Sequence, residues 1–219
     1  MPRILYKKIW GIGFDGTTFK VVHISFGNTN QMSQVSVFTP TKNRWHLVRP
    51  SPHDYSFSSG HGVYFKQSIY WIAKDGEEEI LSVFHLPTET FTRVQTPCHE
   101  TRGAGRVDIC LLKGRPAIFM YVDSMLKIHL LLDENDDRAS WSNFEIKIPK
   151  DSFPIKFLKN DILLLKNEKL ILYNLESKGF EPYDVANMPN IRQATSLWKR
   201  ESNPQATLLF EGVSAGSEG

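Results

Sequence analysis

One stretch of the chain, from His61 to Pro97, constrains the fold most, because it reads as four short strands in a row. Its aromatic, aliphatic and β-branched residues gather in segments of strand length, separated by polar or turn-forming residues. These segments are Val63–Phe65, Ile69–Ala73, Ile80–Leu86 and Phe91–Val94. The stretch therefore predicts two consecutive hairpins that form a small antiparallel sheet.

The same outline recurs before and after this stretch. An aromatic residue follows a polar turn at four places, Trp45, Phe91, Trp141 and Phe180, which lie 46, 50 and 39 positions apart. The first half of each unit is again a segment of strand character: Phe19–Ser25, Val63–Ile72, Ile109–Tyr121 and Ile155–Leu165. Four-stranded repeats at such a spacing are typical of the blades of a β-propeller.

We therefore expect an all-β, β-propeller-like domain over residues 1–210, with a flexible polar tail at 211–219. Four blades of four antiparallel strands are visible, and a fifth would take strands from Met1–Trp10 and Gln193–Phe210, because closure leaves no open sheet edge. No segment carries a capped helical stripe; the nearest, Ile191–Arg200, is broken by polar residues. The alternative is a large β-sandwich.

Three of the hairpins turn at a lysine and the residue after it, at Lys66-Gln67, Lys113-Gly114 and Lys159-Asn160. Gly and Asn readily adopt the positive φ that a two-residue hairpin turn needs. Gln67 does not, so the sequence predicts that its turn is either longer or strained.

Composition argues against several classes of function. The formal net charge is only +2, and Lys and Arg are scattered, so we expect no nucleic-acid partner. No apolar run approaches the roughly 18 residues of a membrane span. The chain has two cysteines, Cys98 and Cys110, without zinc-site spacing, and no Asn-x-Ser/Thr sequon. These features favour a reducing compartment, the cytoplasm or the nucleus.

Motifs that would carry chemistry are weak, and we expect no catalytic, cofactor or metal site. The string Gly11-x-Gly13-x-x-Gly16 fits a phosphate-binding loop, but a strand follows it instead of a helix, so a turn is the better interpretation. The acidic runs Asp75–Glu79 and Asp133–Asp137 are more typical of solvated turns than of calcium sites. Cys98 and Cys110 are interpreted as ordinary reduced cysteines.

The histidines leave a hydrolase open as an alternative. His23, His85 and His129 fall inside expected strands, where a structural histidine is common. Three others lie in loops with Ser, Asp and Glu nearby: His53, His61 and His99. No Gly-x-Ser-x-Gly segment supports a Ser/His/Asp site, however.

The loops between the units are the expected binding surface, since rigid blades hold them in place. The longest loop, Arg49–Gly60, carries His53, Tyr55 and Phe57, whose aromatic rings would either pack on the blades or anchor a partner. A second loop, Pro97–Arg106, carries Arg102 and Arg106, which would meet an acidic surface. Asp184–Arg192 is a third, weaker candidate.

The motifs resemble those of the plant F-box-associated domain, the propeller-like region of plant F-box proteins, including the S-locus type. The resemblance spans about residues 10 to 185 and depends on the order of several short matches. They are Gly11–Asp15 with Phe19–Ile24, Thr41–Trp45, Gly62–Phe65 with Tyr70–Ala73, Ile80–Phe84 with Phe91–Val94, and Ser140-Trp141. The family's Asn-Gly at the first hairpin of the second unit is replaced here by Lys66-Gln67.

The resemblance implies a substrate-recognition domain of an SCF-type ubiquitin ligase that binds a protein target and performs no chemistry. In that family an F-box, which docks an SKP-family adaptor and through it a cullin, precedes the propeller; this chain contains no such segment. A stand-alone binding module or decoy that has lost ligase recruitment is therefore the first alternative. A propeller enzyme acting on a glycan or small molecule is the second.

Overall fold

The computed structural model describes residues 8–25, 34–48, 55–58, 60, 62–97, 107–122, 124–135, 138–150, 152–158, 161–167 and 169–183. In these ranges the chain is almost entirely β-strand, with a single 3₁₀ turn, η1 (Pro40–Lys42). The expected fifth unit draws on residues 1–7 and 193–210, which lie outside the described residues; Lys8–Trp10 belong to the first sheet.

The strands form four successive antiparallel sheets. Sheet 1 contains β1 (Lys8–Phe14), β2 (Phe19–Ser25), β3 (Gln34–Thr39) and β4 (Arg44–Val48). Sheet 2 contains β5 (Ser56–Phe57), β6 (Val63–Phe65), β7 (Ser68–Asp75), β8 (Glu78–His85) and β9 (Thr90–Gln95). Sheet 3 contains β10 (Val107–Leu112), β11 (Arg115–Val122), β12 (Met125–Asn135) and β13 (Arg138–Lys147). Sheet 4 contains β14 (Ser152–Phe157), β15 (Asp161–Lys166), β16 (Lys169–Asn174) and β17 (Phe180–Pro182).

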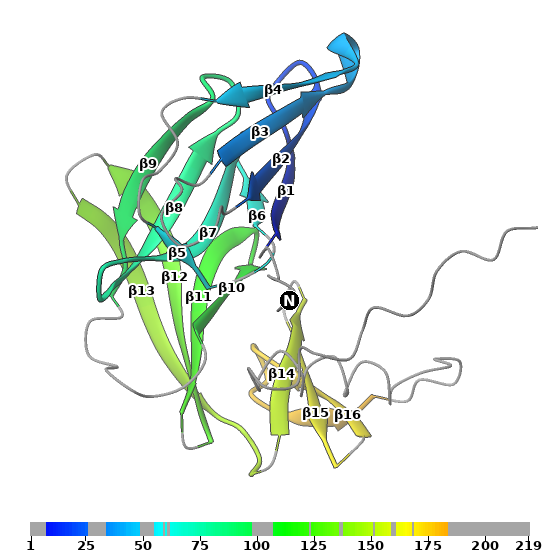
Figure 1. Ribbon diagram of the computed structural model, residues 1–219. Helices are drawn as coiled ribbons and strands as arrows, with labels where there is room; N and C mark the ends of the chain where they lie inside the picture. Colours follow the sequence, from blue (N-terminus) through cyan, green and yellow to red (C-terminus); the bar gives the residue numbers. More distant parts are fainter. Residues whose placement is uncertain are drawn as a thin grey trace, which may run out of the picture.

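The sheets follow one another in chain order, as Figure 1 shows from sheet 1 at the top to sheet 4 at the bottom. Each sheet is an up-and-down meander in which sequential strands pair, except that β5 and β6 both pair with β7. The early strands of neighbouring sheets contact one another, β1 with β6, β6 with β10, and β10 with β14. This arrangement is propeller-like, which confirms the expected fold class over the sandwich.

Three hydrophobic clusters fill the three spaces between neighbouring sheets. Ile24, Trp71 and Phe84 belong to the cluster between sheets 1 and 2. Tyr70 and Ile118 belong to the cluster between sheets 2 and 3, and the cluster between sheets 3 and 4 has its own set of Leu and Ile side chains. The core is therefore divided into layers between sheets, as face-to-face packing of blades requires.

The central strands of sheet 2 are apolar at successive positions, without alternating apolar and polar residues, because both faces of the sheet are covered. In β7, Ile69 and Trp71 point into the first cluster while Tyr70 and Ile72 point into the second. Successive side chains of a strand face opposite ways, so a sheet covered on both faces needs apolar residues at every position. The stretch from His61 to Pro97 thus supplies most of a sheet that has a neighbour on each side.

The repeating aromatic residue has a fixed place in every sheet. Trp45, Phe91, Trp141 and Phe180 each lie on the last strand of their sheet. Three of them sit directly opposite an aromatic residue of the preceding strand: Phe38↔Trp45, Phe84↔Phe91 and Tyr173↔Phe180. Such cross-strand pairs stabilise a sheet edge, which explains the repeat.

The turn at Lys66-Gln67 is a strained two-residue turn. Phe65 pairs with Ser68 across it, and Lys66 and Gln67 have φ angles of 44° and 64°. The next hairpin, at Lys113-Gly114, has a similar geometry with φ angles of 49° and 71°, and glycine supplies its second position. Both turns match the sequence prediction, whereas Lys159 and Asn160 lie outside the described residues.

The glycine string of the N-terminal segment serves packing. Gly11 and Gly13 lie within β1, and only Gly16, with a φ of 101°, lies in the turn after it. A Cβ on Gly11 would lie 2.6 Å from the Trp71 ring, and one on Gly13 would lie 2.4 Å from the Tyr64 ring. The turn interpretation thus holds for the third glycine, while the first two let sheet 1 approach sheet 2 closely.

Candidate functional site

The sequence proposed two aromatic anchors in the loop before β6, and the structure describes both. Phe57 lies in the short strand β5, is only 2% exposed and meets the Trp71 ring edge-on. Tyr55 is partly buried against the same cluster. The Phe57 ring therefore packs on the blades, whereas the Tyr55 ring is only partly covered. The other proposed residues, His53, Arg102 and Arg106, lie outside the described residues.

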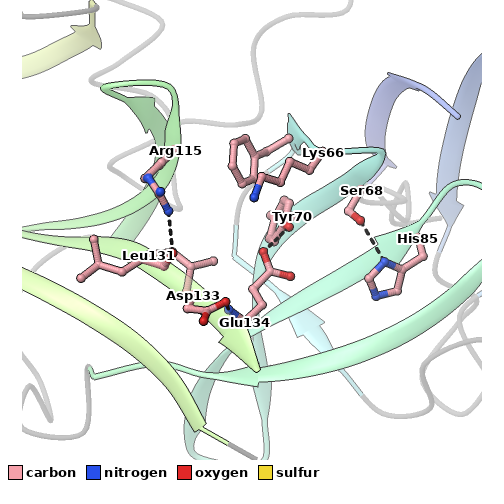
Figure 2. A pocket seen from close by; sticks show the side chains of 10 residues that line it. Lys66, Ser68, Tyr70, His85, Arg115, Leu131, Asp133 and Glu134 are labelled. Carbon is pink, nitrogen blue, oxygen red and sulfur yellow. Dashed lines mark hydrogen bonds between the residues drawn. The ribbon is translucent and has the colours of Figure 1, made fainter. Parts of the chain in front are cut away.

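A cleft of about 230 Å³ opens between sheets 2 and 3 (Figure 2). One wall comes from the β6–β7 hairpin and β8, and the other from β11 and β12. Its apolar lining residues are Phe65, Leu131 and Leu132, and its polar and charged ones are Lys66, Ser68, Tyr70, His85, Arg115, Asp133 and Glu134. This mixture of apolar walls and convergent polar groups is typical of a recognition site.

The wall from sheet 3 is shaped by an irregularity in β12. The pairing of β12 with β13 shifts between Leu131 and Asp133, so that Leu132 is the unpaired extra residue of a bulge. Its side chain is exposed, and its carbonyl oxygen accepts a hydrogen bond from Arg115 Nη1 at 2.5 Å. Bulges often re-aim side chains next to functional sites, and this one fixes the guanidinium of Arg115 at the cleft.

The opposite wall carries a second cation. Lys66 occupies the first position of the strained β6–β7 turn, and its ammonium lies 5.3 Å from the centre of the Phe65 ring. In Figure 2 its side chain extends from sheet 2 towards the space faced by Arg115 of sheet 3. The two cations therefore approach the cleft from different sheets.

The carboxylates of the cleft are held by neighbours. The hydroxyl of Tyr70 donates a short hydrogen bond to Glu134 Oε1. Burial, together with this carboxylate, raises the pKa of the Tyr70 hydroxyl well above its ordinary range. Asp133 Oδ1 accepts the backbone N–H of Glu134 at 2.9 Å. The acidic run Asp133–Asp137 was expected to be a solvated turn, but its first three residues belong to β12, and Asp133 and Glu134 line the cleft.

A serine–histidine pair lies at one end of the cleft. Ser68 Oγ and His85 Nδ1 are 2.9 Å apart, and His85 Nε2 lies 3.1 Å from Thr92 Oγ1. A catalytic triad has a carboxylate where Thr92 stands, and the Ser68 residue is only 3% exposed. Ser68 and His85 also face each other in the β7–β8 register, so the pair joins two strands.

Within the described ranges, no group of three or more His, Cys, Asp or Glu side chains is placed to hold a metal ion. Burial raises the pKa of the Cys110 thiol, which keeps it protonated and a poor nucleophile. Cys98 lies outside the described residues. No helix of the described chain has the length and apolarity needed to span a membrane.

A second surface feature is an apolar face on sheet 1, turned away from sheet 2. It carries five large side chains that are 42% to 61% exposed: Trp10, Ile12, Phe19, Trp45 and Leu47. His23 stacks on Trp10 at 4.1 Å between ring centroids and meets Trp45 edge-on. None of the three interior clusters includes this face.

Sequence reasoning missed the cleft because its residues come from four separate stretches of the chain. Two features of the sequence did mark residues of the cleft: the replacement of Asn-Gly by Lys66-Gln67 and the acidic run that begins at Asp133. A β-bulge has no comparable signature in a single sequence, so the position of Arg115 was not foreseeable.

The four face-to-face sheets and the cleft between two of them define a propeller-like binding domain. The family described as "F-box associated beta propeller domain" matches residues 3–190, most of the chain. The chain belongs to this family, which confirms the resemblance seen in its motifs.

A similar protein is a putative F-box/kelch-repeat protein of Arabidopsis thaliana. It is 22% identical to this chain over 186 residues, which cover 79% of this chain and 49% of the relative. The chain thus spans about half the length of the curated relative that it matches.

Proposed function

We propose that the chain is a protein-binding module that recognises the substrate of an SCF-type ubiquitin ligase. Family membership is the observation that carries this proposal, since the family is named for its association with the F-box. The relative, a putative F-box/kelch-repeat protein, supports the same role. An SKP-family adaptor and a cullin are partners where an F-box is part of the same polypeptide.

The proposed role of the module is to position the target protein, not to react with it. A target held on the rigid sheets is kept within reach of the ubiquitin-charged enzyme that other subunits recruit, so the domain itself needs no reactive group. Affinity in such interfaces is concentrated in a few well-placed side chains. The cleft between sheets 2 and 3 offers a site of this kind, with apolar walls and fixed polar groups.

The test is affinity capture from plant-cell extract with the full chain and two Leu→Trp variants. Leu132→Trp adds bulk at the cleft, whereas Leu111→Trp makes the same change at an exposed position on β10 that does not line it. We expect the unmodified chain and Leu111→Trp to capture the same proteins in similar amounts. The amount captured by Leu132→Trp should be about tenfold lower.

Two results would contradict the proposal at different levels. If no protein is enriched over an unrelated folded control, the chain is not a protein-binding module. If all three chains capture the same proteins equally, binding uses another surface.

The link to the ligase has a separate test. An antibody against this chain should co-precipitate an SKP-family adaptor with the endogenous polypeptide from plant cells. Recovery of bound targets without any adaptor would contradict the ligase role and favour the stand-alone module or decoy.

A further inference from the structure

The cleft between sheets 2 and 3 is lined by two carboxylates and two cations, and each of the four has a neutral partner. Its two carboxylates accept hydrogen bonds, that of Glu134 from the Tyr70 hydroxyl and that of Asp133 from the Glu134 backbone N–H. Its two cations contact only neutral groups, Lys66 the Phe65 ring and Arg115 the Leu132 carbonyl. Among the residues that the structure describes, neither Lys66 nor Arg115 forms an ion pair.

The contacts described for Lys66 and Arg115 use few of their N–H donors. An ammonium carries three N–H donors and a guanidinium five. Among the described residues, the hydrogen bond from Arg115 Nη1 to the Leu132 carbonyl uses one of them. Charge-assisted bonds to a carboxylate are about twice as strong as those between neutral groups. The remaining donors of Lys66 and Arg115 therefore favour an anionic oxygen as their ligand.

The backbone holds both cations in place. The β12 bulge presents the Leu132 carbonyl to Arg115, and the strained turn places Lys66 where hairpins usually have Asn or Gly. Strain retained in a turn often accompanies function. The exposed Leu132 side chain lines the same cleft as Arg115 and offers an apolar contact there.

We propose that this cleft binds an acidic segment of a partner polypeptide, with an Asp or Glu carboxylate between Lys66 and Arg115 and a neighbouring apolar side chain on Leu132. The inference rests on the proposed function, because it names the chemistry of the target that the module recognises. It predicts that binding weakens as salt is added, since the cations are exposed to solvent.

The test is a titration of the ¹⁵N-labelled full chain with three peptides followed by backbone amide shifts. The probes are acetyl-Leu-Glu-Leu-amide and the same peptide with Gln or Lys at the centre. We expect the Glu peptide to shift the amides of residues 65–70 and 131–134, and the Gln peptide to bind about tenfold more weakly. Lys66→Met and Arg115→Met should each weaken the Glu peptide by a similar factor.

The matched control is Lys127→Met, which removes a lysine paired with Glu145 at 3.3 Å on β12 and β13, outside the cleft. It should leave the affinity for the Glu peptide unchanged. Equal binding of the Glu and Gln peptides, or tighter binding of the Lys peptide, would overturn the inference. If that happens while Leu132→Trp still lowers target capture, the acidic preference is wrong and the binding module stands. If, in addition, no protein is enriched over the unrelated folded control, the module itself is contradicted.

Discussion

Gly13 in β1 faces Tyr64 and Leu86 of the neighbouring sheet, and no space remains there for a side chain. A Cβ at this position would lie 2.4 Å from the Tyr64 ring and 2.6 Å from Leu86 Cδ1. Tyr64 cannot easily move, because its hydroxyl donates a hydrogen bond to the Phe14 carbonyl at 2.9 Å. Close packing at this residue therefore fixes the separation of sheets 1 and 2.

Gly13→Ala should lower the free energy of unfolding by about 1–3 kcal/mol, the usual cost of overpacking a core. Urea denaturation of the full chain measures this change. Gly179→Ala is the control, since the nearest atom to its added Cβ is Ser177 Oγ at 3.4 Å. Equal stabilities of the two variants would show that the sheets separate freely at Gly13.

Lys20 forms a buried ionic network between the same two sheets. Its ammonium lies 2.9 Å from Glu89 Oε1 and 3.1 Å from Asp15 Oδ2, and donates to the Leu86 carbonyl at 2.7 Å. His46 Nε2 lies 2.6 Å from the other Glu89 oxygen. Burial opposes ionisation of Glu89, but the hydrogen bonds from His46 and Lys20 outweigh it and lower the pKa of that carboxyl.

The lowered pKa of Glu89 makes stability depend on pH in a definite direction. A carboxyl with a depressed folded pKa contributes stability above its unfolded pKa, near 4.5, and that contribution is lost as the pH falls through the folded value. Glu89→Gln should therefore cost about 2 kcal/mol near pH 7 and progressively less below about pH 4. Unfolding free energies of both chains across this range test the prediction. A cost of Glu89→Gln that does not change with pH would show that ionisation of Glu89 does not cause the pH dependence of stability.

At the scale of the element, the β6–β7 turn combines local strain with a functional side chain. Lys66 and Gln67 both adopt positive φ, where Asn and Gly are favoured. The double change Lys66→Asn with Gln67→Gly should raise the free energy of unfolding by about 1 kcal/mol, because it relieves this strain. The same variant should bind the Glu peptide more weakly. A loss of stability would contradict this interpretation of the turn.

The elements of this fold were largely predictable, because their signals are local. Lys113-Gly114 and the aromatic residues after each polar turn mark hairpins and sheet edges within a few positions of sequence. The cleft was not predictable, since it depends on the bulge at Leu132 and on the meeting of sheets 2 and 3. The burial of Phe57 was not predictable for the same reason, because it depends on contact with Trp71 of another strand.

At the scale of the whole molecule, Trp71 and Trp45 illustrate the difference between a covered and an open sheet face. Trp71 is fully buried between sheets 1 and 2, whereas Trp45 is about half exposed on the apolar face of sheet 1. Trp71→Ala should cost about 3–5 kcal/mol of unfolding free energy, and Trp45→Thr less than about 1 kcal/mol. Urea denaturation monitored by circular dichroism distinguishes the two. A similar loss for Trp45→Thr would mean that its face is covered in solution.

We expect the chain to bind its protein target at the cleft between sheets 2 and 3. Hydrogen exchange of the full chain, measured alone and with a target recovered by affinity capture, locates the binding surface. We expect binding to slow exchange in residues 64–70 and 130–134. Protection confined to β1 and β4, on the apolar face of sheet 1, would contradict it and place the target on that face instead.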